Sequence, residues 1–247
     1  MATRKKTTPD FSKEAPTTLD GQPFYGLELD EKQLEFANAI WNPDIDIVFC
    51  NAAAGTGKTT IATGVANMLV QYGMYDGIIY IMSPVNERRQ GYLPGSITEK
   101  SSVYFEAFYQ ALTVCGVNPN TAVNDDSMVN QKNGTGYITC ITDTFLRGSN
   151  LRDAVIIIDE AENYTIPQLQ KTLTRVGGKA KVVVIGHTLQ CDLDNPNDSG
   201  FEAYIKHFSG VERCAICELV TNHRGWISNW ADRIGESNIG SEFNIKE

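Results

Sequence analysis

The chain has 247 residues, 42% of them hydrophobic, which is enough to bury a full core in one large domain or two small ones. Six scattered cysteines and the lack of an apolar N-terminal leader indicate a disulfide-free protein of the reducing cytoplasm. The longest apolar run, residues 154–158, is far too short to span a membrane. The net charge of −9 argues against a broad basic surface for nucleic acid, so any such contact is expected to be local.

Residues 1–22 are rich in Thr, Lys and Pro, and we expect them to form a mobile arm ahead of a single domain over residues 23–247. Apolar residues at helical spacing behind Asp30 predict a short helix over residues 30–40. Strands are expected at residues 45–50, 77–82, 137–141, 154–158, 181–185 and 213–219. The helices expected between and after them cover residues 61–70, 102–114, 167–176, 201–207 and 226–234.

This alternation of strands and helices predicts an α/β fold with a mainly parallel central sheet and helices on both faces. The strands at residues 78–81, 155–158 and 182–185 are almost wholly apolar and β-branched, as strands covered on both faces must be, so they should form the sheet centre. Residues 116–136 are polar and rich in turn formers, and we interpret them as a surface excursion.

Residues 52–60, Ala-Ala-Ala-Gly-Thr-Gly-Lys-Thr-Thr, lie between the first strand and the following helix. A glycine-rich turn in this context predicts a phosphate-binding loop, because its backbone N–H groups and the helix N-terminus converge on an anion. Lys58 is expected to reach the β and γ phosphates, and Thr59 to offer its hydroxyl to Mg²⁺. The residues expected to cradle the nucleotide are Ala53, Ala54, Gly55, Thr56, Gly57, Lys58, Thr59 and Thr60.

Polar residues end two of the central strands. Asp159 and Glu160 follow the strand at 154–158, where a carboxylate at the carboxyl edge of a parallel sheet can share the metal ion with Thr59. Glu160 is then placed to orient or deprotonate an attacking water. Gln190 follows the strand at 181–185 and could contact the γ-phosphate or that water. His187 in the same loop is more simply interpreted as a solvent-facing histidine.

These residues resemble those of superfamily 1 helicases in the phosphate loop and at 159–162, and more closely those of the PhoH-like ATPase family. The family motifs are matched at residues 83–84, 91–95, 144–148, 151–154, 159–163, 173–175 and 186–193. The resemblance covers about residues 30–230 and implies a RecA-like P-loop NTPase. It further implies that Gln33 reads adenine, so that ATP is preferred over GTP, and that Arg224 contacts the γ-phosphate.

The sequence departs from the family pattern at four positions. Ala52 replaces the first loop glycine and Ser83 replaces an arginine, while Glu162 stands for a glutamine and His187 for an aspartate. The changes at Ser83 and Glu162 remove positive charge and add negative charge, which is expected to affect phosphate sensing or coupling to nucleic acid.

Only 23 residues follow Arg224 in this sequence, so no second RecA-like lobe is expected to cover the ATP site. We therefore expect a homo-oligomer, a hexamer by the family resemblance, in which Arg147 or Arg175 acts in trans. The local basic residues that could gather on one face are Arg88, Arg89, Arg147, Arg152, Lys171, Arg175, Lys179 and Lys181.

The leading hypothesis is an ATPase that couples Mg-ATP hydrolysis to single-stranded nucleic acid, with RNA favoured by the resemblance. The alternative is a nucleotide-dependent regulatory or binding protein with no nucleic-acid track. A small-molecule kinase is disfavoured because no lid or acceptor site is evident. A zinc site at Cys214 and Cys217 with His207 and His223 is also disfavoured, because residues three apart on a strand face opposite ways.

Overall fold

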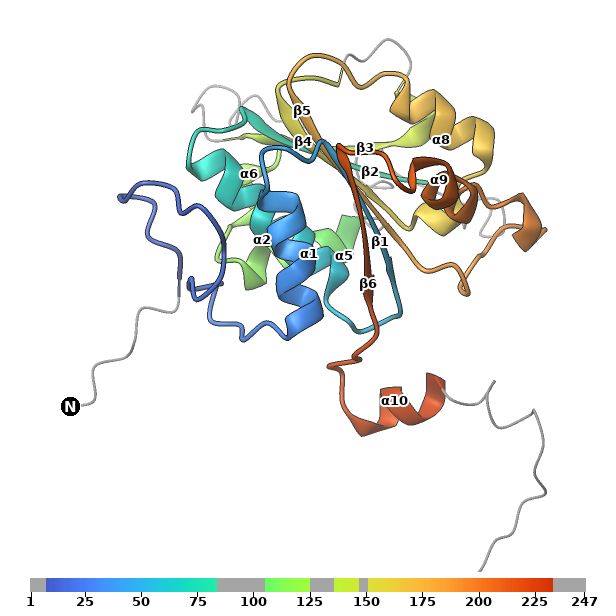
Figure 1. The fold of residues 1–247 in the computed structure, drawn as a ribbon, viewed down its shortest axis with the longest axis horizontal. Coiled ribbons are helices and arrows are strands. Elements are labelled where there is room, and N and C mark those ends of the chain that lie inside the picture. The colour runs from blue at the N-terminus through green and yellow to red at the C-terminus, as the bar shows by residue number, and fades with distance from the viewer. Residues whose placement is uncertain (1–7, 84–104, 125–135, 147–150, 233–247) are drawn as a thin grey trace, which may run out of the picture.

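The computed structural model describes residues 8–83, 105–124, 136–146 and 151–232. Within these residues the chain builds one six-stranded sheet whose registered pairs are all parallel, in the order β3-β2-β4-β5-β1-β6 (Figure 1). The strands are β1 (Ile47–Ala52), β2 (Gly77–Met82), β3 (Ile138–Thr142), β4 (Ala154–Asp159), β5 (Ala180–Gly186) and β6 (Cys214–Leu219). The predicted α/β class with a parallel sheet is therefore confirmed.

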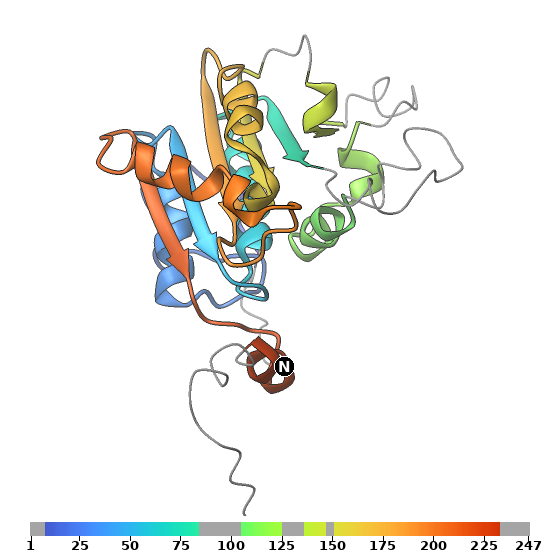
Figure 2. The ribbon, with the colours of Figure 1, turned by 90° about the vertical axis from the view of Figure 1, so that its right-hand side faces the viewer.

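Helices cover both faces of the sheet, as Figure 2 shows in a view turned from that of Figure 1. Alternation along the strands divides the core: Val48 and Cys50 of β1 belong to the larger cluster with α1, α2 and α5, whereas Ile47 and Phe49 face α8 and α9. The helices are α1 (Glu31–Trp41), α2 (Lys58–Gln71), α5 (Glu106–Val114), α6 (Pro119–Ala122), α8 (Ile166–Leu173), α9 (Phe201–Phe208) and α10 (Trp226–Asp232). None of the helices in the described ranges is long and apolar enough to cross a membrane.

The starts of α1 and α2 are set by different local signals. Asp30 caps α1 through a reciprocal pair of bonds with Gln33, the capping box that favours a helix start. Helix α2 starts at Lys58, three residues before the predicted start, because Gly57 at φ 82° turns the chain directly into the helix. The first turn of α2 is thus part of the phosphate loop itself.

The segment expected to be a mobile arm, residues 1–22, is described from residue 8 onward, and this part contacts the domain. Leu19 is only 3% exposed and belongs to the core cluster on the α1 face. Its backbone N–H donates to Asn38 Oδ1 at 2.8 Å, and Trp41 Nε1 donates to the Pro16 carbonyl at 2.9 Å. Leu19 and Phe11, whose ring meets that of Tyr72 with centroids 5.2 Å apart, pack against the core, and two hydrogen bonds with side chains of α1 add to this contact, although the average composition of the segment is polar.

The expected surface excursion at residues 116–136 is described over residues 116–124, most of which keep contact with solvent, and two of these residues pack into the domain. Asn118 caps the short helix α6, Ala122 is buried, and Val123 forms a parallel bridge with Ile138 at the start of β3. Asn118 and Pro119, which suggested a turn, instead form the start of α6, and Val123 after this helix pairs with the edge strand β3. Residues 125–135 lie outside the described part.

Replacement of Leu19 tests whether this segment belongs to the folded domain. Leu19→Ala should lower the free energy of unfolding by about 2–4 kcal/mol, because it leaves a cavity in the core. Thr18→Ala, next to it and exposed, is the matched control and should change stability by less than about 0.5 kcal/mol. Denaturant unfolding followed by circular dichroism measures both, and equal stability of the two variants would mean that the segment is not packed in solution.

Candidate nucleotide site

The phosphate loop follows β1, and hydrogen bonds within the loop, from α1 and from the residues after β6 hold its shape. Thr56 Oγ1 donates to the Ala53 carbonyl at 2.9 Å inside the loop. Gly55 and Gly57 both have positive φ, of 76° and 82°, which side chains rarely tolerate. The loop therefore needs glycine at these two positions for its backbone path, as the sequence motif predicted.

Asp159, the last residue of β4, connects three elements at the edge of this loop. Its Oδ2 accepts from Thr59 Oγ1 at 2.9 Å and from the Tyr80 hydroxyl at 2.8 Å, and its Oδ1 accepts from the Glu160 N–H at 2.8 Å. Asp159 is only 3% exposed, and a carboxylate so deeply buried requires such partners. The predicted meeting of Thr59 and Asp159 is thus present, and Tyr80 is a third member that no sequence motif marked.

Tyr80 is placed by the aromatic residues of the neighbouring helix. Its ring stacks on Phe108 of α5, with centroids 4.1 Å apart, and meets Phe105 edge-on at 6.0 Å. Within the apolar strand β2 it looks like an ordinary core residue, and only the strand alternation, which directs its hydroxyl toward α2, could have indicated its role.

Glu160 stands at the point where the chain leaves the sheet, in the left-handed conformation with φ 51°. By its accessible surface Glu160 is an exposed residue, although other protein groups surround its carboxyl group. Desolvation of its carboxyl group by the surrounding protein is the larger cause of a raised pKa, and the negative charge of Asp159 adds to it. Together they raise the pKa of Glu160 to about 7, while the positive charge of Lys58 lowers it. A carboxylate with a pKa near neutrality, next to the phosphate loop, has the properties of a general base.

The two departures Glu162 and His187 are in contact. Glu162 follows Glu160 in the turn η3 (Ala161–Asn163), is 5% exposed, and accepts from the His187 N–H at 3.0 Å. Burial raises the pKa of Glu162 to about 7. Gly186 leaves room for this carboxylate, since a Cβ there would lie 2.5 Å from Glu162 Oε2. His187 is therefore fixed to η3 through its backbone and is not a free loop residue.

Further bonds connect the loop after β5 to both neighbouring strands. Asp192 N–H donates to Asn163 Oδ1 at 2.8 Å, and Asn51 at the end of β1 exchanges hydrogen bonds with Thr188 at 3.1 and 3.2 Å. Gln190 lies in this loop with its side chain exposed. The loop that carries Gln190 is thus connected to the ends of the strands that carry the phosphate loop and Asp159.

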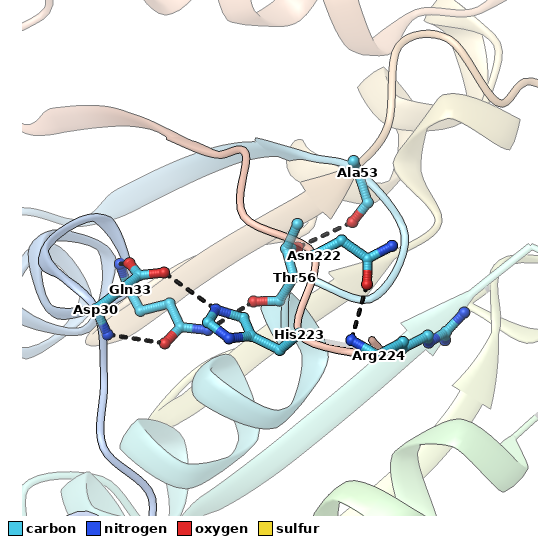
Figure 3. A network of polar contacts seen from close by, with 7 residues as sticks. All are labelled: Asp30, Gln33, Ala53, Thr56, Asn222, His223 and Arg224. Atoms are coloured by element: carbon cyan, nitrogen blue, oxygen red, sulfur yellow. Dashed lines mark hydrogen bonds and ion pairs between the residues drawn. The ribbon is translucent and has the colours of Figure 1, made fainter. Parts of the chain in front are cut away.

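On the other side, α1 and the segment after β6 contact the phosphate loop together, as Figure 3 shows. Gln33, 7% exposed, donates from Nε2 to the Thr56 carbonyl at 2.8 Å while its Oε1 accepts from Asp30 N–H. His223 N–H donates to the Gly55 carbonyl at 2.9 Å, and its imidazole Nε2 lies 3.1 Å from Asp30 Oδ2.

The post-β6 segment, residues 222–224, is close enough to the loop to restrict it. A Cβ on Gly55 would collide with the Asn222 side chain and lie 3.0 Å from Arg224 Cδ. Asn222 Oδ1 in turn accepts from the Arg224 N–H at 2.8 Å. Gln33 and Arg224, expected from the family resemblance, therefore both lie at the phosphate loop. Asn222, which carried no signal in the sequence, lies there too, as does His223, which the sequence marked only as a disfavoured zinc ligand.

The basic residues proposed to gather on one face have different environments. Lys181 is 1% exposed and donates to the Asn42 and Ile45 carbonyls, so its expected role on a basic surface is wrong. Arg175 donates to the Leu146 carbonyl and Lys171 to that of Asp143, while Arg152 and Lys179 are exposed. Arg88, Arg89 and Arg147 lie outside the described residues, as does the motif around residues 91–95.

The residues at the end of β4 fit a magnesium ion. A hydroxyl from Thr59 and a carboxylate from Asp159 meet at the edge of the phosphate loop, and oxygen atoms are the ligands that Mg²⁺ prefers. Asp159 and Glu160 together place negative charge opposite Lys58. Thr59 and Asp159 are thus the residues that would hold the ion.

A glycine-rich loop between β1 and α2, a lysine and a threonine at the start of α2, and an aspartate at the end of a nearby buried strand define a P-loop nucleotide-binding protein of RecA-like fold. The model of the family described as "PhoH-like protein" matches residues 28–224. The chain belongs to the PhoH family.

Curated relatives agree with this assignment. The chain is 33% identical over 183 residues to a PhoH-like protein of Mycobacterium leprae, covering 72% of this chain and 50% of the relative. It is 31% identical over 192 residues to Protein PhoH of Escherichia coli K12, covering 77% of this chain and 52% of the relative. The chain thus spans about half the length of the curated relatives it matches.

Two solved structures are among the matches. One is the large terminase of a thermophilic bacteriophage in complex with ADP, with a TM-score of 0.47 and 13% identity, covering 78% of this chain and 46% of that one. The other is the Hef helicase domain of Pyrococcus furiosus, with a TM-score of 0.41 and 15% identity, covering 76% of this chain and 37% of that one.

The contact between His223 and Asp30 predicts a modest contribution to nucleotide affinity. His223→Ala should raise the Kd for ATP by about 2- to 5-fold, because a half-exposed polar pair is worth about 1 kcal/mol or less. His207→Ala on α9, on the far face of the sheet, is the control and should leave the Kd unchanged. Isothermal titration calorimetry measures both, and an unchanged Kd in His223→Ala would show that the post-β6 segment does not support the loop.

Proposed function

We propose that this chain binds Mg-ATP and hydrolyses it, and that hydrolysis is coupled to single-stranded nucleic acid, with RNA as the favoured polymer. The observation that carries the ATPase proposal is the cluster around Asp159, which brings Thr59 of the phosphate loop and the raised-pKa carboxylate of Glu160 to one edge of the sheet. A purely structural loop would have no need of a buried carboxylate at this position.

In the proposed reaction the phosphate loop binds the triphosphate through its backbone N–H groups, and Lys58 places its charge against the β and γ phosphates. The magnesium ion, when bound by Thr59 and Asp159, supplies charge neutralisation for the phosphates. Glu160 accepts a proton from the attacking water, and Arg224 can place its guanidinium against the charge that develops on the γ-phosphate. Gln190 is proposed to contact the γ-phosphate or the water from the loop after β5.

The preference for ATP remains a proposal that rests on Gln33. Its amide already connects α1 to the Thr56 carbonyl, so the residue supports the loop whatever base is bound. One amide proton and one oxygen lone pair remain for a base edge, since each group of an amide can form two hydrogen bonds.

The raised pKa of Glu160 predicts a pH dependence of hydrolysis. A general base must be ionised to accept a proton, so kcat should rise with pH through about 7 and level off above it. Glu160→Gln should lower kcat by about 10²- to 10⁴-fold relative to the wild-type plateau above pH 7, and it should remove the rise with pH. Steady-state phosphate release between pH 5.5 and 9 measures these profiles.

Glu162 is the matched control for this profile, because its pKa is also about 7. Glu162→Gln should keep the rise near pH 7 if Glu160 is the base. Loss of that rise in Glu162→Gln, with full activity in Glu160→Gln, would assign the titration to Glu162 and contradict the proposed role of Glu160.

Coupling to a polymer is supported by the loop after β5. This loop is bonded to η3 beside Glu160 and to Asn51 at the end of β1, so a change at the γ-phosphate can shift it. It also exposes Leu189, whose side chain is 86% accessible, next to Gln190. An exposed apolar side chain on a nucleotide-linked loop could contact the bases of a single strand.

We further propose that the active form is a homo-oligomer, a hexamer by family resemblance, in which a neighbouring copy completes the ATP site. Arg147 and Arg175 are the candidates to act in trans. Arg175 is anchored to the Leu146 carbonyl of its own chain, which would hold its guanidinium at a fixed position on the surface. Light scattering combined with ATPase assays tests this, because a monomer with full activity would contradict it.

A nucleotide-dependent regulatory protein without a nucleic-acid track is the alternative, and the net charge of −9 favours it. The two are separated by the ATPase rate with and without single-stranded RNA or DNA, at low and moderate salt. The polymer-coupled ATPase predicts stimulation that fades as salt rises, because phosphate contacts release counterions. A hydrolysis rate that neither polymer changes would support the regulatory protein. Glu212→Gln, which alters an exposed carboxylate before β6, is the control and should hydrolyse ATP as wild type does under each condition.

A further inference from the structure

A cavity lies at the edge of the sheet opposite the phosphate loop. The phosphate loop follows the carboxyl end of β1, whereas this cavity is lined by residues at the amino ends of β1 and β5, among them Ile47 and Ala180. Its volume is about 760 Å³, within the range of roughly 300–1,000 Å³ that small-molecule sites occupy. We call it the amino-edge cavity.

The walls of the amino-edge cavity are mainly apolar and come from separate parts of the chain. Trp41 at the end of α1, Leu69 near the end of α2 and Phe208 at the end of α9 all line it. The N-terminal segment closes one side at Pro16, whose carbonyl accepts from Trp41 Nε1. Apolar and aromatic walls of this kind suit a flat, ring-bearing molecule.

Positive charge predominates among the ionisable residues of the cavity. Lys179, Lys181 and Arg213 line it together with a single carboxylate, Asp46, which is paired with Arg213 at 2.5 Å. Lys179 lies over the Tyr75 ring with its Nζ 5.1 Å from the centroid. Two lysines therefore remain without a paired carboxylate among the residues that line the cavity.

Lys181 is unusual because a charged side chain is so rarely buried. It is 1% exposed, and its ammonium donates to the carbonyls of Asn42 and Ile45, just after the end of α1. The negative end of the helix dipole at this place stabilises a positive charge. These bonds use two of its three N–H groups. Burial lowers the pKa of Lys181 to about 8, although Asp46 and Asp44 act against this, so its charge is only partly compensated.

We propose that the amino-edge cavity is a second ligand site, separate from the nucleotide site, and that it binds a small organic anion with an apolar, ring-bearing body. The body lies against Trp41 and Leu69 on the α1 face of the sheet, and the carboxylate, sulfonate or phosphate group lies toward Lys181 and Lys179. Such a ligand supplies the negative charge that the cavity lacks and fills its apolar walls. Because the cavity joins the ends of α1 and α2, which both start at the phosphate loop, its occupancy can influence the nucleotide site.

Anilinonaphthalene sulfonate, an aromatic sulfonate whose fluorescence rises in apolar sites, is the probe. Titration calorimetry and fluorescence should show one saturable site per chain that saturating Mg-ATP does not displace. Lys181→Met should weaken binding by about 10-fold or more, because it removes a charge-assisted hydrogen bond and keeps the length of the side chain. Ala180→Phe, which fills the cavity, should weaken it by a similar factor.

Three further variants make the result decisive. Lys206→Met removes an exposed lysine of α9 and should bind the probe as wild type does. Trp226→Ala/Trp230→Ala removes two aromatic rings of α10 that are more than 70% exposed, and it should also leave binding unchanged. Lys179→Ala alters an exposed residue at the cavity, so it tests the charge requirement even where Lys181→Met does not fold, and it should weaken binding.

Unchanged affinity in both Lys179→Ala and Ala180→Phe would overturn the proposal, as would displacement of the probe by Mg-ATP. Loss of binding in Trp226→Ala/Trp230→Ala would place the probe on α10 and overturn it equally. The thermal unfolding midpoint of each variant, measured without the probe, separates loss of the site from loss of the fold.

Discussion

The carboxylate of Asp159 accepts hydrogen bonds from the phosphate loop, from β2 and from its own strand's end, and the arrangement of the site depends on it. A buried carboxylate is costly unless its oxygens are bonded, and here Thr59, Tyr80 and the Glu160 N–H provide three donors. The same bonds fix Thr59 at the start of α2 and hold the turn that carries Glu160. Loss of this carboxylate would therefore disturb the loop, the metal ligands and the base together.

The parallel sheet makes this convergence possible. All six strands point the same way, so the ends of β1, β4 and β5 meet at one edge, and each contributes one part of the site. Contacts from outside the sheet complete it: Gln33 of α1 donates to the Thr56 carbonyl, and His223 after β6 donates to the adjacent Gly55 carbonyl. The nucleotide site is thus built at the ends of the central strands and completed by segments near the two ends of the described chain, whereas the opposite edge of the sheet carries the separate amino-edge cavity.

Much of this was readable from the sequence, because the relevant signals are local. The apolar runs gave β2 its exact bounds and the other strands theirs to within about two residues, and the glycine motif, Asp159 and Glu160 were recognised from residue type and spacing. The failures involve distant contacts. Leu19 is buried against α1. Tyr80 resembles a core residue in the sequence, but its hydroxyl donates to Asp159. Lys181 donates to a carbonyl just after the end of α1 and is therefore not on the surface. The joint placement of Glu162 and His187 likewise required the fold, since 25 residues separate them.

The central claim is that Asp159 organises a magnesium-dependent nucleotide site at the carboxyl edge of the sheet. The most direct test measures the Kd of a non-hydrolysable ATP analogue by titration calorimetry with Mg²⁺ and with EDTA, for wild type and for Asp159→Asn. Our account predicts that Mg²⁺ tightens binding to wild type by about 10-fold or more and that Asp159→Asn loses this difference while it still binds the analogue weakly through the loop. Equal affinity with Mg²⁺ and EDTA in wild type, or an unchanged magnesium effect in Asp159→Asn, would contradict it.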